Sequence, residues 1–368
     1  MKKIVSTSAK IITSIFILGL VLGYASPYFH PNTISFLPFF GLSYPIFAGG
    51  VIVFMLIWAV FKSKWAIFCL FFLLIGGKLH FRSFAYNLTN SSESANNPGN
   101  KLKLLSYNVR LFGIYEPSNA MQNRDGIFSF LRKENPDVAC FQEYYRQDKP
   151  TKFETFDSLM SSIHAIDYHE RSAHKISGRQ NFGIAMFSKY PMIAKGDVMF
   201  DTQSSSDFNY CIFADIVKGK DTFRIYNVHL QSIRLQEGNY TAERIGNQRI
   251  PSKSTIIKVI KKLRLAYQKR ADQARRVVAH ASNSPYPSVI CGDFNDTPMS
   301  YCYNQFNRKY IDAFRNSAWG IGSTYIGRLP AGRIDYIFHT PTLNSSEFQV
   351  HSEKLSDHRA ISCKIEKL

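Results

Sequence analysis

The stretch "SVICGDFNDTP", residues 288–298, carries the clearest structural signal in this 368-residue chain. Its apolar run, Val289-Ile290-Cys291, has the length and composition of a buried strand. Gly292 ends the run, and Asp293 and Asn295 follow at once. Taken alone, this pattern is more typical of a turn in which Asp and Asn side chains bond to nearby backbone groups. Other strand ends must therefore decide whether it belongs to a site.

Other predicted strands also carry, at or next to one end, side chains that bind metals or transfer protons. These residues are Asn108 in "KLKLLSYNV" (101–109), Glu143 in "DVACFQE" (137–143), His229 in "TFRIYNVHL" (222–230), Asp335 in "GRIDYIFH" (332–339), and Asp357 and His358 in "LSDHR". Each alone has an ordinary explanation, such as a cap, a salt bridge or a hydrogen-bonded histidine. Their joint occurrence at strand ends instead predicts one site of carboxylates, amides and imidazoles.

The remaining periodicity predicts a mixed fold. Apolar runs indicate further strands at 182–191, 210–217 and 358–365, and helical spacing indicates helices at 125–137 and about 254–282. The order shows neither strict βαβ alternation nor the even spacing of an all-β domain. An α/β (α+β) fold, such as a layered α/β sandwich, is therefore predicted.

Six blocks occur in an order that resembles a known family. They are "LLSYNVR", "CFQE", "NVHL", "CGDFNDTP", "GRIDYIF" and "SDHRA", and they lie within residues 101–366. Together they resemble the endonuclease/exonuclease/phosphatase superfamily, the DNase I-like metal-dependent phosphoesterases. The resemblance implies a four-layered α/β sandwich, in which helices flank two packed sheets and the site lies at one end.

The resemblance also implies a metal cofactor, which is Mg²⁺, with Mn²⁺ as the alternative. Glu143 would hold the ion, with Asn108 and Asp357 close by. Oxygen ligands of this kind suit Mg²⁺ better than zinc. Asp293 would orient or deprotonate the attacking water, and the Asn295 amide would fix the phosphate or the nucleophile.

Two histidines complete the implied catalytic group. His358 would pair with Asp335, whose carboxylate holds one tautomer and stabilises the imidazolium. His229 would donate to the phosphate or to the leaving oxygen. Some nucleases of the family support the equivalent of His229 with a carboxylate, but the corresponding stretch here, "RQNFGIAMF", contains none. Phosphate binding is therefore favoured for His229 over proton donation.

The first hundred residues differ in composition from the rest. Apolar runs near 11–29, 40–61 and 65–81 predict about three transmembrane helices within a membrane region, residues 1–86. The Asn/Ser-rich stretch 87–100 is predicted to be a linker, and residues 101–368 to be the catalytic domain. A cleaved signal peptide is the alternative for the first run, and two spans are the alternative for the whole region.

Lysine positions predict the orientation of these helices. Lys2, Lys3 and Lys10, and then Lys62 and Lys64, fit the cytoplasmic side by the positive-inside rule. Three spans would place the catalytic domain on the periplasmic or extracellular side of the cytoplasmic (inner) membrane. Two spans would leave it in the cytoplasm.

Charge limits the substrate class without deciding it. The net charge is +18, and residues 101–368 still hold 38 Lys/Arg against 26 Asp/Glu, a net +12. A basic domain suits an anionic partner such as nucleic acid, a phosphate ester or an anionic lipid surface. The six cysteines show no metal-binding spacing.

A membrane-anchored, nuclease-like phosphoesterase that cleaves phosphodiesters, or alternatively phosphomonoesters, is therefore the leading prediction. A lipid, sphingomyelin or inositol-phosphate phosphodiesterase is the first alternative. A non-catalytic scaffold that binds polyanions is the second.

Overall fold

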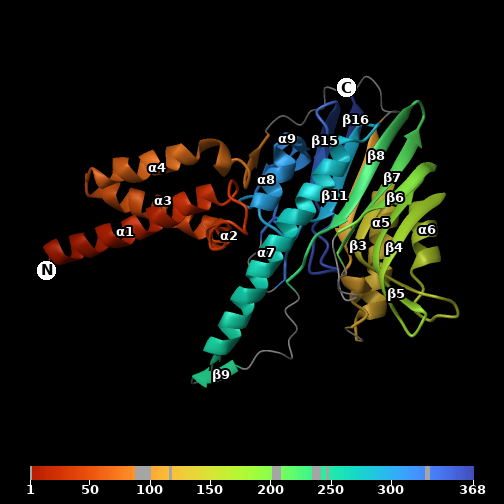
Figure 1. The fold of residues 1–368 in the computed structure, drawn as a ribbon, viewed down its shortest axis with the longest axis horizontal. Coiled ribbons are helices and arrows are strands. Elements are labelled where there is room, and N and C mark those ends of the chain that lie inside the picture. The colour runs from red at the N-terminus through yellow and green to blue at the C-terminus, as the bar shows by residue number, and fades with distance from the viewer. Residues whose placement is uncertain are drawn as a thin grey trace. The chain divides into compact units, whose positions relative to one another are not determined.

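The computed structural model divides the chain into two compact units, drawn in Figure 1. It describes residues 2–87, 101–115, 118–200, 209–233, 242–245, 248–327 and 332–368. The first unit contains Met1–His80, Gln231–Asp272 and Met299–Asn304, and the second contains Phe81–Leu230, Gln273–Pro298 and Gln305–Leu368. The expected linker, 87–100, lies outside the described residues except for Asn87, so the domain boundaries stay a prediction.

The first unit is built on apolar helices. They are α1 (Lys2–Ala25), α2 (Leu37–Leu42), α3 (Tyr44–Val60) and α4 (Trp65–His80). Within the described residues, Thr7–Ala25 of α1 is long and apolar enough to cross a membrane, whereas α3 and α4 are shorter apolar helices. A signal sequence near the N-terminus can contain an apolar helix of the same kind. The short strands β9 (Ala242–Ile245) and β10 (Gln248–Pro251) also belong to this unit.

The second unit contains two six-stranded sheets. Sheet I has the order β15-β16-β2-β3-β5-β4, and sheet II has the order β12-β14-β11-β8-β7-β6. The strands of sheet I are β2 (Leu102–Asn108), β3 (Val138–Gln147), β4 (Asp167–Ile176), β5 (Gln180–Ser188), β15 (Leu343–Val350) and β16 (Ile361–Lys367). Those of sheet II are β6 (Met192–Val198), β7 (Tyr210–Lys218), β8 (Asp221–His229), β11 (Ser288–Asp293), β12 (Ile311–Asp312) and β14 (Asp335–His339).

Helices cover the outer faces of both sheets, as Figure 1 shows. Helices α5 (Ala120–Glu134) and α6 (Phe156–Ile163) pack on sheet I. The end of α7 (Lys253–Ser282) packs on sheet II, where Tyr226 Oη lies 2.9 Å from His280 Nδ1. Helix α8 (Tyr301–Asn307) adds Phe306, which stacks on Phe338.

One apolar core fills the space between the sheets. Leu104 and Val138 of sheet I pack in it with Ile225 and Val289 of sheet II, and all four are fully buried. Together with the outer helices this makes four layers, so the predicted α/β sandwich is confirmed. The smaller elements are β1 (Ala85–Tyr86) paired with β13 (Trp319–Gly320), the 3₁₀ helix η2 (Arg110–Gly113) and α9 (Ala313–Ser317).

The strands that the sequence did not predict lie at sheet edges. β4 and β15 are the outer strands of sheet I, and β6 and β12 are those of sheet II. An edge strand has a neighbouring strand on one side only, and apolar and polar residues alternate along it. In β6, for example, even the apolar Ile193 is 59% exposed. Such strands lack the continuous apolar run by which the central strands are recognised.

Gly292 decides how β11 packs against β8. Its φ is +141°, and a Cβ built on it would lie 1.9 Å from the backbone oxygen of Val228. Only glycine fits this close approach. The next residue but one, Phe294, then turns into the core beside Phe306 and Tyr336 and is fully buried. The buried Phe294 side chain thus fixes the position of the motif, and Asp293 is the last residue of the strand.

We predict that Gly292→Ala destabilises the protein by about 3 kcal/mol or more, because a backbone atom blocks the new methyl group. Gly178→Ala is the matched control: Gly178 also has a positive φ, +68°, but open space around it, so it carries only the conformational cost of about 1–2 kcal/mol. Chemical unfolding of both variants measures the difference. Equal stabilities would contradict the steric explanation.

Candidate active site

Strand register brings three of the predicted site residues into one row. β8 and β11 are parallel, and their register pairs His229 with Asp293. β11 and β14 are antiparallel, and their register pairs Asp293 with Asp335. The three residues are nearly fully buried. Residues from three separate sequence motifs therefore lie side by side on sheet II.

Sheet I brings its own polar strand end to the same place. The parallel strands β2 and β3 pair Asn108 with Gln142, the residue before Glu143. Asn108 Nδ2 donates to Asp293 Oδ2 across 2.9 Å, and this hydrogen bond joins the two sheets at the site. Asn108 Oδ1 accepts from the backbone N–H of Arg110 at 3.0 Å.

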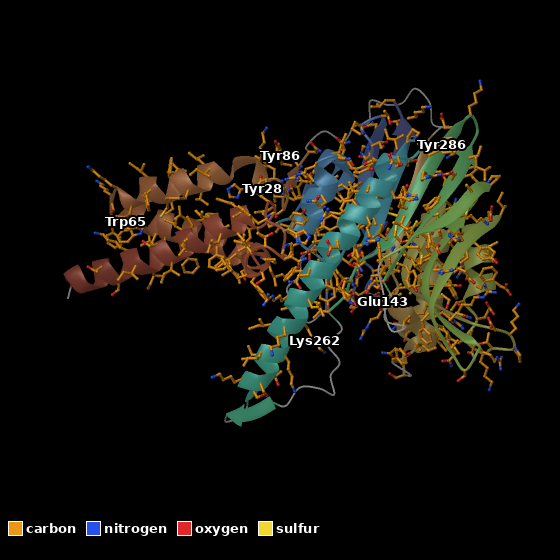
Figure 2. The ribbon with its side chains drawn as sticks, viewed as in Figure 1. Tyr28, Trp65, Tyr86, Glu143, Lys262 and Tyr286 are labelled. Carbon is orange, nitrogen blue, oxygen red and sulfur yellow. The ribbon has the colours of Figure 1, made fainter. Side chains whose placement is uncertain are left out.

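Glu143 is aimed into the site by a β-bulge. The register of β3 against β5 shifts between Phe141 and Tyr144, and Glu143 has a φ of +48°. A bulge of this kind redirects a side chain that regular alternation would place elsewhere. The carboxylate, labelled in Figure 2, is about a third exposed, and its Oε1 lies 4.0 Å from His229 Nε2.

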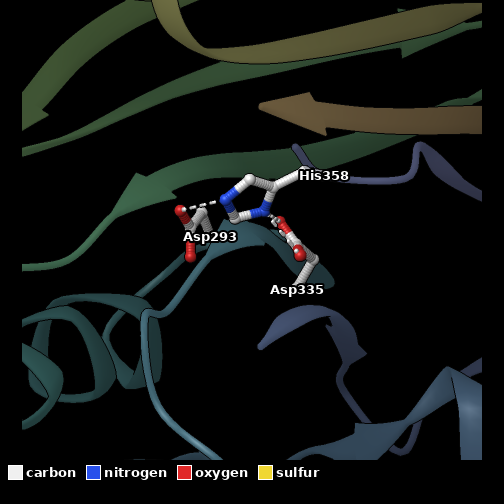
Figure 3. Close-up of side chains that lie close together, drawn as sticks. All are labelled: Asp293, Asp335 and His358. Carbon is white, nitrogen blue, oxygen red and sulfur yellow. Dashed lines mark hydrogen bonds and ion pairs between the residues drawn. The ribbon is translucent and has the colours of Figure 1, made fainter. Parts of the chain in front are cut away.

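Asp293, Asp335 and His358 form a closely packed group (Figure 3). His358 Nδ1 lies 3.0 Å from Asp335 Oδ2, and His358 Nε2 lies 3.7 Å from Asp293 Oδ2. One ligand atom from each residue lies within 4.8 Å of the others, a spacing that could hold a metal ion only with a neutral His358 ring. Because both ring nitrogens face carboxylates, the imidazolium form of His358 is favoured.

Electrostatics agree with that geometry. Burial alone would lower the pKa of His358, but the carboxylates of Asp335 and Asp293 outweigh it and raise the pKa to about 10. Burial raises the pKa of Asp293 to about 6, although the nearby His358 opposes the shift. Burial and the charge of Asp357 raise the pKa of Glu143.

The two remaining predicted residues lie at the edges of this group. Asp357 Oδ2 lies 3.7 Å from Arg110 Nε, and Ser356 Oγ connects the segment to the backbone oxygen of Asn108 at 2.8 Å. Asn295 has a φ of +52°, and its Nδ2 donates to the backbone oxygen of Leu230. The contacts of the Asn295 amide are thus with the chain itself.

Four residues that border or support the site were not predicted from the sequence. Arg110 lies beside Asp357, and Tyr325 packs edge-on against His358 with the ring centroids 5.1 Å apart. Behind the site, Gln142 Nε2 donates to Asn227 Oδ1 at 2.6 Å, and Asn227 Nδ2 donates to two backbone oxygens of sheet I. Arg110, Gln142 and Asn227 lie inside the blocks that resemble the family, and this position is the signal that could have found them, whereas Tyr325 lies in none of the blocks.

The donor set fits a hard divalent cation. Glu143 and Asp357 are two carboxylates near each other, and the Asp357 charge raises the pKa of Glu143. A cation between them would relieve that repulsion. Carboxylate and carboxamide oxygens are the ligands that Mg²⁺ and Mn²⁺ prefer.

The endonuclease/exonuclease/phosphatase family matches residues 105–358, which is more than half of the chain. The chain belongs to this family. A second family, a domain of unknown function (DUF8431), matches residues 2–83. Among curated proteins, none matches the chain.

Solved structures share the fold of this endonuclease/exonuclease/phosphatase protein. A family member from Bacteroides vulgatus is 17% identical with a TM-score of 0.52, over 73% of this chain and 99% of that one. The human Nocturnin catalytic domain with bound sulfate is 16% identical, with a TM-score of 0.51 over 73% and 94%. A mannosyl-6-phosphatase from Bacteroides thetaiotaomicron is 15% identical, with a TM-score of 0.50 over 72% and 99%. At such identities the likeness shows the fold alone.

The charge of His358 can be tested directly. We predict that in metal-free protein its imidazole stays protonated from pH 6 to 8, and that Asp335→Asn lowers its pKa because the nearest carboxylate is lost. Histidine-selective NMR, with the resonance assigned from His358→Gln, measures this titration. The raised pKa also stabilises the fold at acidic and neutral pH, and this contribution is lost as pH rises through about 10. An unchanged His358 titration in Asp335→Asn would contradict the pairing.

Proposed function

We propose that this protein is a membrane-anchored, divalent-metal-dependent phosphoesterase that hydrolyses phosphodiester bonds. The observation that carries the proposal is the buried group of Asp293, Asp335 and His358, next to Glu143 at a strand bulge. Buried carboxylates and an imidazolium are costly to fold around, so their collection at one point is typical of a reaction site. Family membership supports phosphate-ester hydrolysis as the reaction class.

Glu143, Asn108 and Asp357 would hold the metal ion, Mg²⁺ or Mn²⁺. When bound, such an ion binds a phosphate oxygen and offsets negative charge that develops in the transition state. The hydrogen bond from Asn108 to Asp293 connects this oxygen-rich side of the site to the side that handles protons.

The second side is suited to general acid–base chemistry. With a pKa of about 6, Asp293 is mostly deprotonated at neutral pH and can accept a proton from an attacking water. His358 carries a proton and faces the same carboxylate, while Asp335 holds its ring in place. His229, buried between Glu143 and Asp293, would bind a phosphate oxygen. Asn295 would support the end of β11 in addition to its expected role at the phosphate.

Nucleic acid is the substrate class that the proposal puts first, because residues 101–368 carry a net charge of +12. A phospholipid or other lipid phosphodiester is a second candidate, favoured by the apolar helices α1, α3 and α4. These helices would keep the site near a bilayer, where lipid headgroups are concentrated.

We predict that Glu143→Gln, Asp293→Asn and His358→Ala each lower turnover by about 10²-fold or more, because each removes a charge or a proton-transfer group. The full chain in detergent, with Mg²⁺ or Mn²⁺, is assayed on bis(p-nitrophenyl) phosphate, plasmid DNA and phospholipid vesicles. Glu347→Gln is the matched control, since Glu347 is an exposed residue paired with Lys364.

The same assay separates the candidate functions. DNA nicking that falls steeply with salt supports the nuclease, and turnover of vesicles alone supports the lipid phosphodiesterase. Full metal-dependent turnover by Glu143→Gln would contradict the proposed site. No turnover of any substrate by the wild type, with DNA still bound, would favour the polyanion-binding scaffold.

The proposal for topology is three membrane spans with the catalytic domain on the periplasmic or extracellular side. We expect an alkaline phosphatase fused after Leu368 to be active, because this reporter works only outside the cytoplasm. A fusion at Lys62, between the second and third spans, is the control and is expected to be inactive. Two inactive fusions would instead place the catalytic domain in the cytoplasm, as two spans would.

A further inference from the structure

The first half of α7 has a composition unlike that of the rest of the helix. From Lys253 to Ala271 it contains seven basic residues and no acidic one, and the first carboxylate is Asp272. Lys258, Lys261 and Lys262 are exposed, and Lys262 is labelled in Figure 2. This segment, Lys253–Asp272, lies in the first unit with the apolar helices α1 to α4.

An exposed apolar stripe accompanies these charges. Ile256, Ile260 and Leu263 follow the spacing of one helix face. Ile256 and Ile260 are each 47% exposed, and the neighbouring Ile257 is 44% exposed. By contrast, Val277 and Ala281 in the second half are buried. An amphipathic helix that leaves its apolar face exposed needs an apolar partner.

The apolar face of α7 continues from the exposed stripe to a residue that contacts α2. Tyr267, one turn beyond Leu263 on the same face, packs edge-on against Phe39 of α2 with the ring centroids 5.8 Å apart. Asp272 Oδ1 then lies 3.3 Å from His30 Nε2. His30 and Phe39 belong to the segment that follows the end of α1 at Ala25. The contact therefore ties α7 to the end of the helix that is long enough to cross a membrane.

From these observations we propose that Lys253–Tyr267 is an interfacial helix that lies on an anionic phospholipid surface. Its isoleucines would enter the boundary between headgroups and acyl chains, and its lysines would strengthen binding through their electrostatic attraction to the anionic surface. This proposal goes beyond hydrolysis. It agrees with the proposed membrane insertion of α1 but does not require it. A nucleic-acid track would use the same lysines, but it would leave the exposed isoleucines unexplained.

The test places an environment-sensitive fluorophore on single introduced cysteines of the full chain. All six native cysteines are buried, so the introduced thiols can be labelled selectively, with wild type as the background. Ile260→Cys reports the apolar face, and Lys258→Cys reports the opposite face. Ile15→Cys, on an exposed position of α1, reports membrane insertion itself. The chain is reconstituted in phosphatidylcholine vesicles with or without phosphatidylglycerol.

In vesicles that contain phosphatidylglycerol, we expect the Ile260 probe to emit at shorter wavelength and to be quenched by spin-labelled lipid several-fold more strongly than the Lys258 probe. Replacing Lys258, Lys261 and Lys262 with Gln, behind the Ile260 probe, is expected to remove most of this quenching. Equal quenching at Ile260 and Lys258, or equal quenching with and without phosphatidylglycerol, would overturn the proposal.

Three further outcomes separate this proposal from the alternatives. If the Ile15 probe is quenched by lipid but the Ile260 probe is not, α1 is inserted and the proposal of an interfacial helix is wrong. If Ile260 is quenched and Ile15 is not, the helix proposal stands and the proposed anchor fails. If duplex DNA changes the Lys258 signal while lipid changes neither α7 probe, the face is a nucleic-acid track and the proposal is overturned.

Discussion

Two buried carboxylates in this fold share one buried imidazole. Asp293 and Asp335 come from adjacent strands, and His358 comes from the segment before the last strand. Buried charges of one sign are unfavourable unless an opposite charge lies close to them. His358 satisfies that constraint by facing Asp335 with Nδ1 and Asp293 with Nε2. The C-terminal segment is therefore required both for the charge balance of the site and for sheet I, through β16.

Backbone strain is concentrated around the same group. Glu143 and Asn295 both have positive φ values, and Gly292 lies against a backbone oxygen of β8. Conformations of this kind cost free energy and persist only where the surrounding structure holds them. Here the surrounding structure is two packed sheets joined by the Gln142–Asn227 hydrogen bond directly behind the site. The stiffness of the sandwich thus serves the precision of the site.

Local sequence patterns predicted the central strands and the polar residues at their ends, because a buried strand needs a continuous apolar run. The same rule failed for the edge strands β4, β6, β12 and β15, which lack that run. It also gave no sign of the bulge that redirects Glu143, since a register shift depends on the partner strand. Tyr325 was missed because its contact with His358 joins segments without a shared pattern.

In the first unit, too, the sequence predicted some features and the tertiary structure decided others. Apolar composition indicated helices in the first hundred residues, but only the folded chain shows that the start of α7 belongs to the same compact unit. By itself, the sequence determined the family, the α/β class and the residue types of the site, because these depend on composition and order along the chain. The tertiary structure alone decided which carboxylates share His358 and which face of α7 is left exposed. Both depend on distances between segments that are remote in sequence, and such distances arise only when the sheets pack and the strand registers are set.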